Sequence, residues 1–125
     1  MITNIKANPT EWEKPIYIAS FLDIQTDDDD NEIRVYDEPI LYNFNYQPVN
    51  SYAEITEFGE KASGMKRMVI PVKYANFFKE YDVAYVDGVT PDGESKNGMN
   101  ANYKLLPPRI GNSVIIIYLE KLTGK

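Results

Sequence analysis

Residues 113–122 constrain the fold more than any other stretch, because they are apolar on both faces of an extended chain. Their side chains fall into two alternating sets, Val114, Ile116 and Tyr118 on one face and Ile115, Ile117 and Leu119 on the other. A strand with one face in water alternates apolar and polar residues, whereas a strand covered on both sides is apolar throughout. We therefore expect this strand at the centre of a sheet or at a contact between subunits.

Shorter segments with a period of two precede this strand and predict that the chain is built from strands. They are residues 16–24, 33–36, 40–48, 65–72 and 81–86, separated by turn-forming residues. Residues 73–80 have the spacing of one helical turn between two of these strands. About six short strands with turns at intervals of roughly ten residues predict an all-β fold, a small antiparallel β-barrel or a sandwich.

The length of 125 residues allows one hydrophobic core, so we expect a single domain over residues 15–125. Two prolines exclude a helix longer than about two turns from the first segment, and residues 1–14 are predicted to form an N-terminal arm. Two long connections interrupt the strands, residues 48–64 and residues 89–103. The second is rich in glycine and asparagine and is predicted to be a surface loop or an extended hairpin tip.

Four consecutive acids lie between two alternating segments and predict a hairpin with an acidic tip. They are Asp27, Asp28, Asp29 and Asp30. In a tight turn their carboxylates point in different directions and repel one another, whereas a calcium loop needs acids at alternate positions, a central glycine and a distal glutamate. We expect a solvated turn, and weak cation binding by these four aspartates is the alternative.

The connection at residues 48–64 has the features of a short helix inside a long loop. Ser51 and Glu54 have the spacing of a capping box, and Gly59 is placed to end the helix. A helix this short is marginal alone, so it orders according to what it contacts, and long loops in compact domains are usually functional. The candidate functional residues here are Asn50, Ser51, Tyr52, Ala53, Glu54, Ile55, Thr56, Glu57, Phe58, Gly59, Glu60 and Lys61. The alternative is a simple element that closes one end of the barrel.

Histidine and cysteine are both absent from the chain. Their absence excludes disulfides, the usual zinc sites, haem and iron–sulfur ligation, and catalytic pairs that depend on either residue. The carboxylates of Glu54, Glu57, Asp82 and Asp87 have no spacing that demonstrates a cleft, and we interpret them as surface residues. We expect no enzymatic activity and no cofactor, and neither a membrane span nor an export signal.

Charge is distributed unevenly along the chain, whose net charge is −6. Residues 1–60 have three bases and thirteen acids, a net of −10, and residues 61–125 have ten bases and six acids, a net of +4. One interpretation is chance, and the other is an acidic face and a basic face that meet head to tail in an assembly. The candidate contact residues for such an assembly are Trp12, Tyr42, Phe44, Tyr46, Ile115 and Ile117.

The order of these elements resembles that of the head-tail joining proteins of tailed bacteriophages, the head-closure or stopper family of the virion neck. The strand that ends Tyr46-Gln47-Pro48-Val49 is similar to the family's strand that ends in a proline-containing segment before its loop. The run Tyr81-Asp82-Val83-Ala84-Tyr85-Val86-Asp87-Gly88 looks like the family's hydrophobic strand that closes on a glycine turn. The likeness extends over residues 15–122, in which residues 89–102 form a longer insertion than the family's usual tight hairpin.

This resemblance implies a small β-barrel whose subunits form a homo-oligomeric ring in the virion neck, assembled in the cytoplasm of the bacterial host. Residues 48–64 would enter the channel and close it after DNA packaging, and the ring would dock the tail. The implied partners are further copies of the chain, the portal and adaptor proteins, and a tail-completion or tail-tube protein. Genomic double-stranded DNA would pass without specific binding, which suits an acidic protein because it does not hold phosphates.

Two other functions fit the same residues. A tail-completion or tail-terminator protein would share the barrel and the ring but would dock to the tail tube. A monomeric β-barrel module that binds a carbohydrate or another small ligand would use the aromatic face formed by Tyr42, Phe44 and Tyr46.

Overall fold

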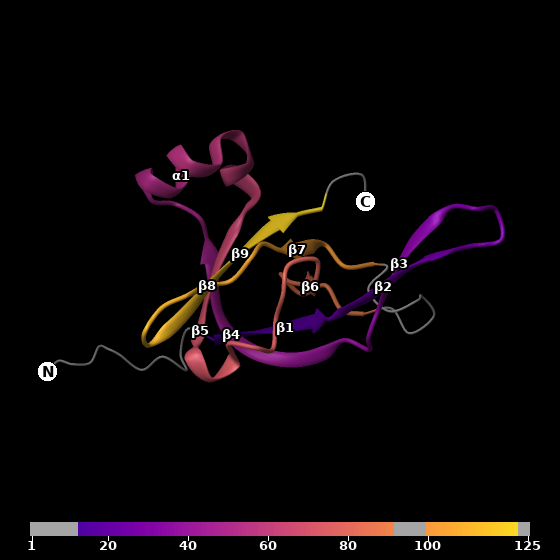
Figure 1. Ribbon diagram of the computed structural model, residues 1–125. Helices are drawn as coiled ribbons and strands as arrows, with labels where there is room; N and C mark the ends of the chain where they lie inside the picture. The colour runs from indigo at the N-terminus through magenta and orange to yellow at the C-terminus, as the bar shows by residue number, and fades with distance from the viewer. Residues whose placement is uncertain (1–12, 92–99, 123–125) are drawn as a thin grey trace, which may run out of the picture.

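The computed structural model describes residues 13–91 and 100–122, which form nine strands, one α-helix and two 3-10 helices (Figure 1). In chain order the elements are β1 (Glu13–Ala19), β2 (Phe21–Thr26), β3 (Glu32–Tyr36), β4 (Ile40–Pro48), α1 (Tyr52–Phe58), η2 (Gly59–Gly64), β5 (Lys66–Pro71), η3 (Val72–Tyr74), β6 (Val83–Tyr85), β7 (Tyr103–Leu105), β8 (Arg109–Ile110) and β9 (Val114–Lys121). None of the helices in these two ranges has the length and apolar character needed to cross a membrane.

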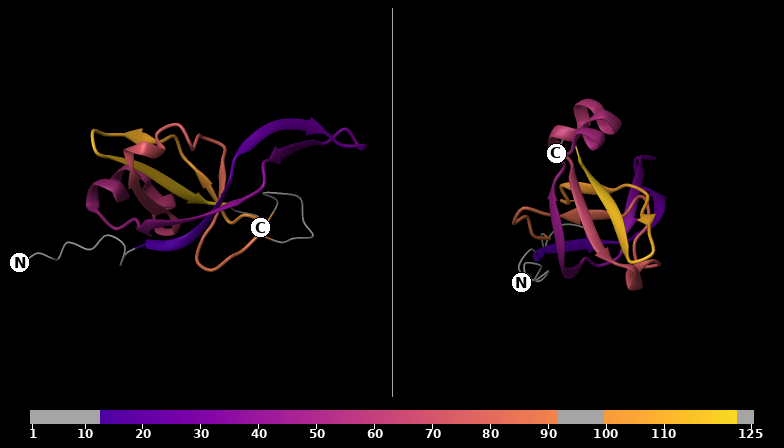
Figure 2. Two further views of the ribbon diagram at one scale, coloured as in Figure 1. Left: turned by 90° about the horizontal axis from the view of Figure 1, so that it is seen from below. Right: turned by 90° about the vertical axis from the view of Figure 1, so that its left-hand side faces the viewer.

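Six of the strands close into an antiparallel barrel. Their order is β5-β4-β1-β6-β7-β9, and β9 pairs back to β5 to complete the circle. Strand β8 pairs with β9 as an additional strand of the same sheet, and the right-hand view of Figure 2 shows the strands arranged around the core. The predicted all-β fold, a small antiparallel barrel, is confirmed.

The period-two pattern of the strands places one set of side chains inside the barrel. The buried set includes Ile16, Ile18, Phe44, Tyr46, Met68, Ile70, Ile115, Ile117 and Leu119. The other face of β9 is also covered, because Tyr118 packs with residues of the helical segment in a second cluster. The predicted cover on both faces is therefore present at Tyr118 and comes from the same chain, whereas Val114 at the start of the strand is 41% exposed.

The first predicted strand, residues 16–24, is two strands that belong to different sheets. Strand β1 ends in the barrel, and after Ser20 the chain enters β2, which within the described residues pairs with β3 in a two-stranded sheet. The register shifts between Phe21 and Asp23, and such an irregularity bends a strand. The chain therefore leaves the barrel and forms the predicted hairpin as a projecting arm (Figure 1).

Two strands near the C-terminal part of the fold were not predicted. Strands β7 and β8 contain three and two residues, which is too short for alternation to be recognised in a sequence. Of the connection predicted at residues 89–103, positions 92–99 lie outside the described residues, and its last residue begins β7. Positions 1–12 of the predicted arm also lie outside them, and its last two residues belong to β1.

Candidate functional site

The connection between β4 and β5 is a helical cap, defined here as residues 50–64, and it contains α1 and η2. The side chain of Ser51 accepts a hydrogen bond from the backbone N–H of Glu54 at 3.1 Å. The carboxylate of Glu54 accepts one from the backbone N–H of Ser51 at 3.3 Å, which completes the predicted capping box. Gly59 follows the helix at a φ of 63°, a conformation that glycine adopts without strain.

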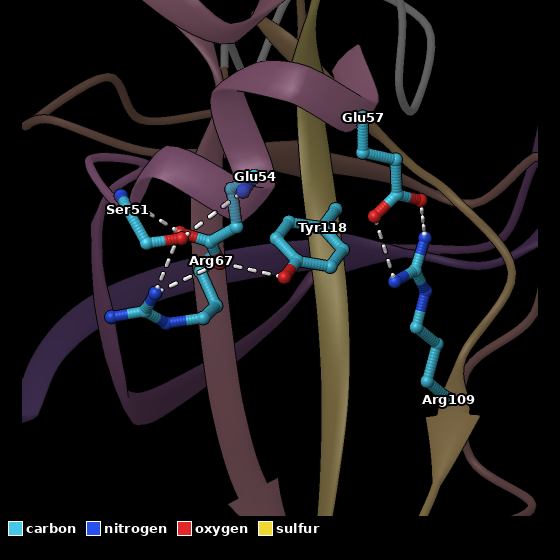
Figure 3. A network of polar contacts seen from close by, with 6 residues as sticks. All are labelled: Ser51, Glu54, Glu57, Arg67, Arg109 and Tyr118. Atoms are coloured by element: carbon cyan, nitrogen blue, oxygen red, sulfur yellow. Dashed lines mark hydrogen bonds and ion pairs between the residues drawn. The ribbon is translucent and has the colours of Figure 1, made fainter.

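The carboxylate of Glu54 is the centre of a polar network beneath the cap (Figure 3). Nη1 of Arg67 donates to both carboxylate oxygens, at 2.9 and 2.8 Å. The hydroxyl of Tyr118 donates to Oε2 at 2.6 Å, and the hydroxyl of Ser51 donates to Oε1 at 2.9 Å. Three separate elements, the start of α1, β5 and β9, are therefore joined at one buried carboxylate.

The network holds Glu54 in its charged form although the residue is only 6% exposed. Burial raises the pKa of the carboxyl group, but the hydrogen bonds from Tyr118, Arg67 and Ser51 together outweigh burial and lower the pKa from 4.5 to about 2. The pKa of Tyr118 is raised, first by burial and then by its hydrogen bond to this carboxylate. At neutral pH the hydroxyl is therefore the donor and the carboxylate the acceptor.

A second contact joins the far end of α1 to the barrel. The guanidinium of Arg109, on β8, forms a two-pronged ion pair with the carboxylate of Glu57. This hydrogen bond lowers the pKa of Glu57. The same guanidinium lies 4.8 Å from the ring centroid of Tyr118, and the ring of Phe58 lies 4.8 Å from that of Tyr118. The cap is thus attached at both ends of α1, and its packing against β9 is aromatic.

The outer face of α1 is apolar and points away from this anchored side. Tyr52 is 86% exposed and Ile55 is 48% exposed. They are three residues apart, so they lie on one face of the helix. The cap therefore presents two large apolar side chains to its surroundings while a buried ion pair fixes the position of the helix.

The predicted loop residues come together in this cap, but their structural roles differ. Glu54 was interpreted as a surface residue, and this is wrong, because its carboxylate is buried and bound by four groups. The sequence left open which contacts order this segment, and in the structure they come from the same chain. Arg67, Tyr118 and Arg109 anchor it from within the same chain.

The anchoring residues could not be recognised from the sequence. Arg67 and Tyr118 are far apart in the chain, and only the pairing of β5 with β9 makes them direct partners in the register. On β9 the side chain of Tyr118 points outward because its neighbours Ile117 and Leu119 point into the core. The doubly apolar pattern of this strand was the one signal that something covers its outer face.

The predicted contact residues lie mostly in the core. Phe44 and Tyr46 are buried, as are Ile115 and Ile117, so their use as subunit contacts is corrected: they fill the barrel. Tyr42 is partly buried and stacks on Phe44 with ring centroids 5.0 Å apart. An open aromatic platform for a carbohydrate is therefore not formed by these side chains. The remaining candidate, Trp12, lies outside the described residues.

Of the other acids singled out in the sequence, Asp82 is buried and the four at the hairpin tip lie in a turn. Asp82 is buried, contrary to expectation, and its carboxylate accepts backbone N–H groups of Phe21 and Lys79 at 2.9 Å each. The predicted acidic tip of the hairpin is present, and in it Asp27 accepts the backbone N–H groups of Asp29 and Asn31. No group of three or more acidic side chains in the described ranges is arranged to hold a metal ion, so the geometry does not support the cation-binding alternative.

Comparison with known proteins gives a fold and no family. No family model matches the sequence, and no curated protein matches it. The structure is similar to the solution structure of protein SF1141 from Shigella flexneri 2a, with a TM-score of 0.57. The two proteins are 16% identical, and the match covers 89% of this chain and 93% of that chain. This likeness concerns the arrangement of the strands alone.

Proposed function

We propose that the protein is a structural component of the neck of a tailed bacteriophage, where copies form a ring that closes the DNA channel and docks the tail. The cap acts as the closing element, and no chemical step is involved. The observation that carries the proposal is the anchored cap, a helix held at a buried carboxylate with Tyr52 and Ile55 on its outer face. The likeness in element order described above supports it.

Closure by this cap is steric. Tyr52 and Ile55 of neighbouring copies meet across the channel and bury apolar surface, which stabilises the contact. The bases of the cap region are already used, because Lys61 pairs with Glu120 at 3.7 Å and Arg67 pairs with Glu54. With its positive charges neutralised, the cap does not hold the phosphates of passing DNA.

The test is retention of packaged DNA by heads assembled with altered caps. Deleting the cap would remove Glu54 and strip partners from Arg67 and Tyr118, so point substitutions are more informative. A Tyr52→Ser, Ile55→Ser variant keeps the network, and we expect filled heads that carry it to release nuclease-sensitive DNA. Thr56→Ala, on the exposed surface of the same helix, is the matched control.

Unchanged retention in the double variant would contradict the closing role. The genes beside this one give an independent check, because a portal or capsid gene on one side and tail genes on the other are expected. A tail-completion protein remains the sibling proposal, and it differs in binding purified tail tubes rather than portal complexes.

A further inference from the structure

The β2–β3 hairpin, residues 21–36, lies apart from the barrel. In the described chain its two strands pair with each other and with no strand of the barrel, and the hairpin points away from the cap in both Figure 1 and the left-hand view of Figure 2. A two-stranded hairpin is at best marginally stable alone. The outer backbone edges of its strands remain available for pairing.

The root of this hairpin is fixed although the rest of it projects. The buried carboxylate of Asp82 accepts the backbone N–H of Phe21 at 2.9 Å, and the backbone N–H of Asp37 donates to the carbonyl of Ser20 at 2.8 Å. Tyr36 packs in a cluster with residues of the barrel. A projecting element with a fixed direction loses less conformational entropy when it docks.

An apolar surface follows the hairpin outward. Leu22 is 58% exposed, and Ile24 is 48% exposed. Ile24 lies in a shallow hollow of about 240 Å³ that it forms with Phe21, Arg34 and Tyr81. Large apolar side chains that are exposed on one projecting element, with polar residues around them, are typical of an interaction site.

Charge indicates what covers this surface. The hairpin contains six acids and one base, a net charge of −5, and Asp37 and Glu38 directly after it make the net charge of residues 21–38 −7. The rest of the described chain contains eight acids and nine bases, and its acids Glu54, Glu57, Asp87 and Glu120 are already in ion pairs. Five of its lysines form no ion pair with a described residue, namely Lys14, Lys73, Lys79, Lys104 and Lys121. Four of its acids, Glu13, Glu60, Glu80 and Asp82, also form no ion pair with a described residue. The rest of the described chain is therefore close to neutral and keeps five lysines that can pair, whereas residues 21–38 have a large excess of negative charge.

We propose that the hairpin docks on the barrel of a second copy of this chain, in a head-to-tail contact that deepens the proposed ring and rests on it. A symmetric contact between two hairpins would bring two acidic tips together, and their repulsion disfavours it. A hairpin on a barrel pairs opposite charges and buries Leu22 and Ile24. A heterologous contact of this kind repeats from copy to copy and closes into a ring where its rotation completes a full turn.

The experiment is sedimentation velocity of the full chain over a range of protein concentrations at low salt and at about 0.5 M salt, where charge pairs are screened. We expect wild-type self-association that weakens with salt. Ile24→Ser and the double substitution Asp28→Lys, Asp29→Lys should each raise the dissociation constant about tenfold or more. Thr56→Ala is the control, because Thr56 is an exposed residue of the cap to which neither proposal assigns a contact, and this variant should associate like the wild type.

The outcomes separate this inference from the proposed function. Association that is unchanged in both hairpin variants overturns the hairpin contact and leaves the ring standing. A wild-type chain that stays monomeric at every concentration overturns both. Urea unfolding of each variant verifies that it is folded, and the substituted side chains are all exposed, so loss of association in a folded variant supports the contact.

Discussion

The cap and the β2–β3 hairpin are two excursions from the same barrel, and both are acidic and rich in turn-forming residues. In the cap, Glu54 is buried and meets a guanidinium and two hydroxyls. In the hairpin, Asp28, Asp29 and Asp30 are exposed, and their charge is left to the solvent or to a partner. The difference shows what a buried acidic side chain needs in this fold. Glu54 is stabilised because two distant strands, β5 and β9, place hydrogen-bond donors beside its carboxylate.

The largest effect is expected when the carboxylate beneath the cap is removed. Glu54→Ala leaves the buried hydroxyl of Tyr118 and the guanidinium of Arg67 without their acceptor, and should lower the free energy of unfolding by about 3 to 5 kcal/mol. Urea unfolding measures the change. Glu60→Ala, at an exposed position of the same cap, is the control with an expected change under about 0.5 kcal/mol. Equal effects of the two would show that the buried carboxylate of Glu54 stabilises the fold no more than an exposed carboxylate does.

Low pH should destabilise the fold because it protonates the carboxylate of Glu54 beneath the cap. The pKa of Glu54 is about 2 in the folded chain against 4.5 ordinarily, so the unfolded chain binds the proton more tightly. The charged carboxylate of Glu54 contributes about 3 kcal/mol to the free energy of unfolding above about pH 4.5. This contribution is lost as the pH falls toward 2. Urea unfolding from pH 6 to 2.5 should show this loss, and Glu54→Gln should remove it.

The pKa of Asp82, a buried carboxylate at the root of the hairpin, changes in the opposite direction to that of Glu54. Burial raises the pKa of Asp82 although two backbone N–H groups bind it. Protonation of this group therefore favours the folded chain relative to the unfolded one, so Asp82 does not contribute to acid unfolding. If Glu54→Gln kept the full acid dependence, the assignment of that dependence to the cap would be wrong.

A smaller effect is expected from Arg67→Met, which removes one partner and keeps the carboxylate. Glu54 then retains Ser51 and Tyr118, so the free energy of unfolding should fall by about 2 kcal/mol. Because a hydrogen bond that lowers the pKa of Glu54 is lost, acid unfolding should begin at a higher pH than in the wild type. The same pH series measures both changes, and an unshifted acid transition would contradict the network.

The smallest effect is expected in the hairpin. Ile24→Ser changes an exposed side chain, so the free energy of unfolding of the isolated chain should change by less than about 0.5 kcal/mol. Amide hydrogen exchange should be faster in residues 22–35 than in the cap, because the hairpin has one sheet neighbour per strand. Slow exchange in the hairpin at concentrations where the chain is monomeric would show that the two regions are equally anchored.

Much of the fold followed from local pattern. The alternation in residues 40–48 and 113–122 predicted two strands and which of their side chains share a face, and the capping box at Ser51 and Glu54 predicted the start of α1. These features depend on neighbours within four residues, and such contacts form wherever the chain folds. The break at Ser20 was missed because β1 and β2 keep a similar alternation while they belong to different sheets.

By itself the sequence determined an all-β fold, a last strand that is apolar on both faces and a helix in the connection at residues 48–64. The tertiary structure alone decided that the helix is anchored at Glu54, since Arg67 and Tyr118 become partners only through the pairing of β5 with β9. It also turned Phe44, Tyr46, Ile115 and Ile117 from contact candidates into core residues. The physical reason is that alternation states which residues share a face, whereas closure of the sheet decides whether that face meets the core, another element or water.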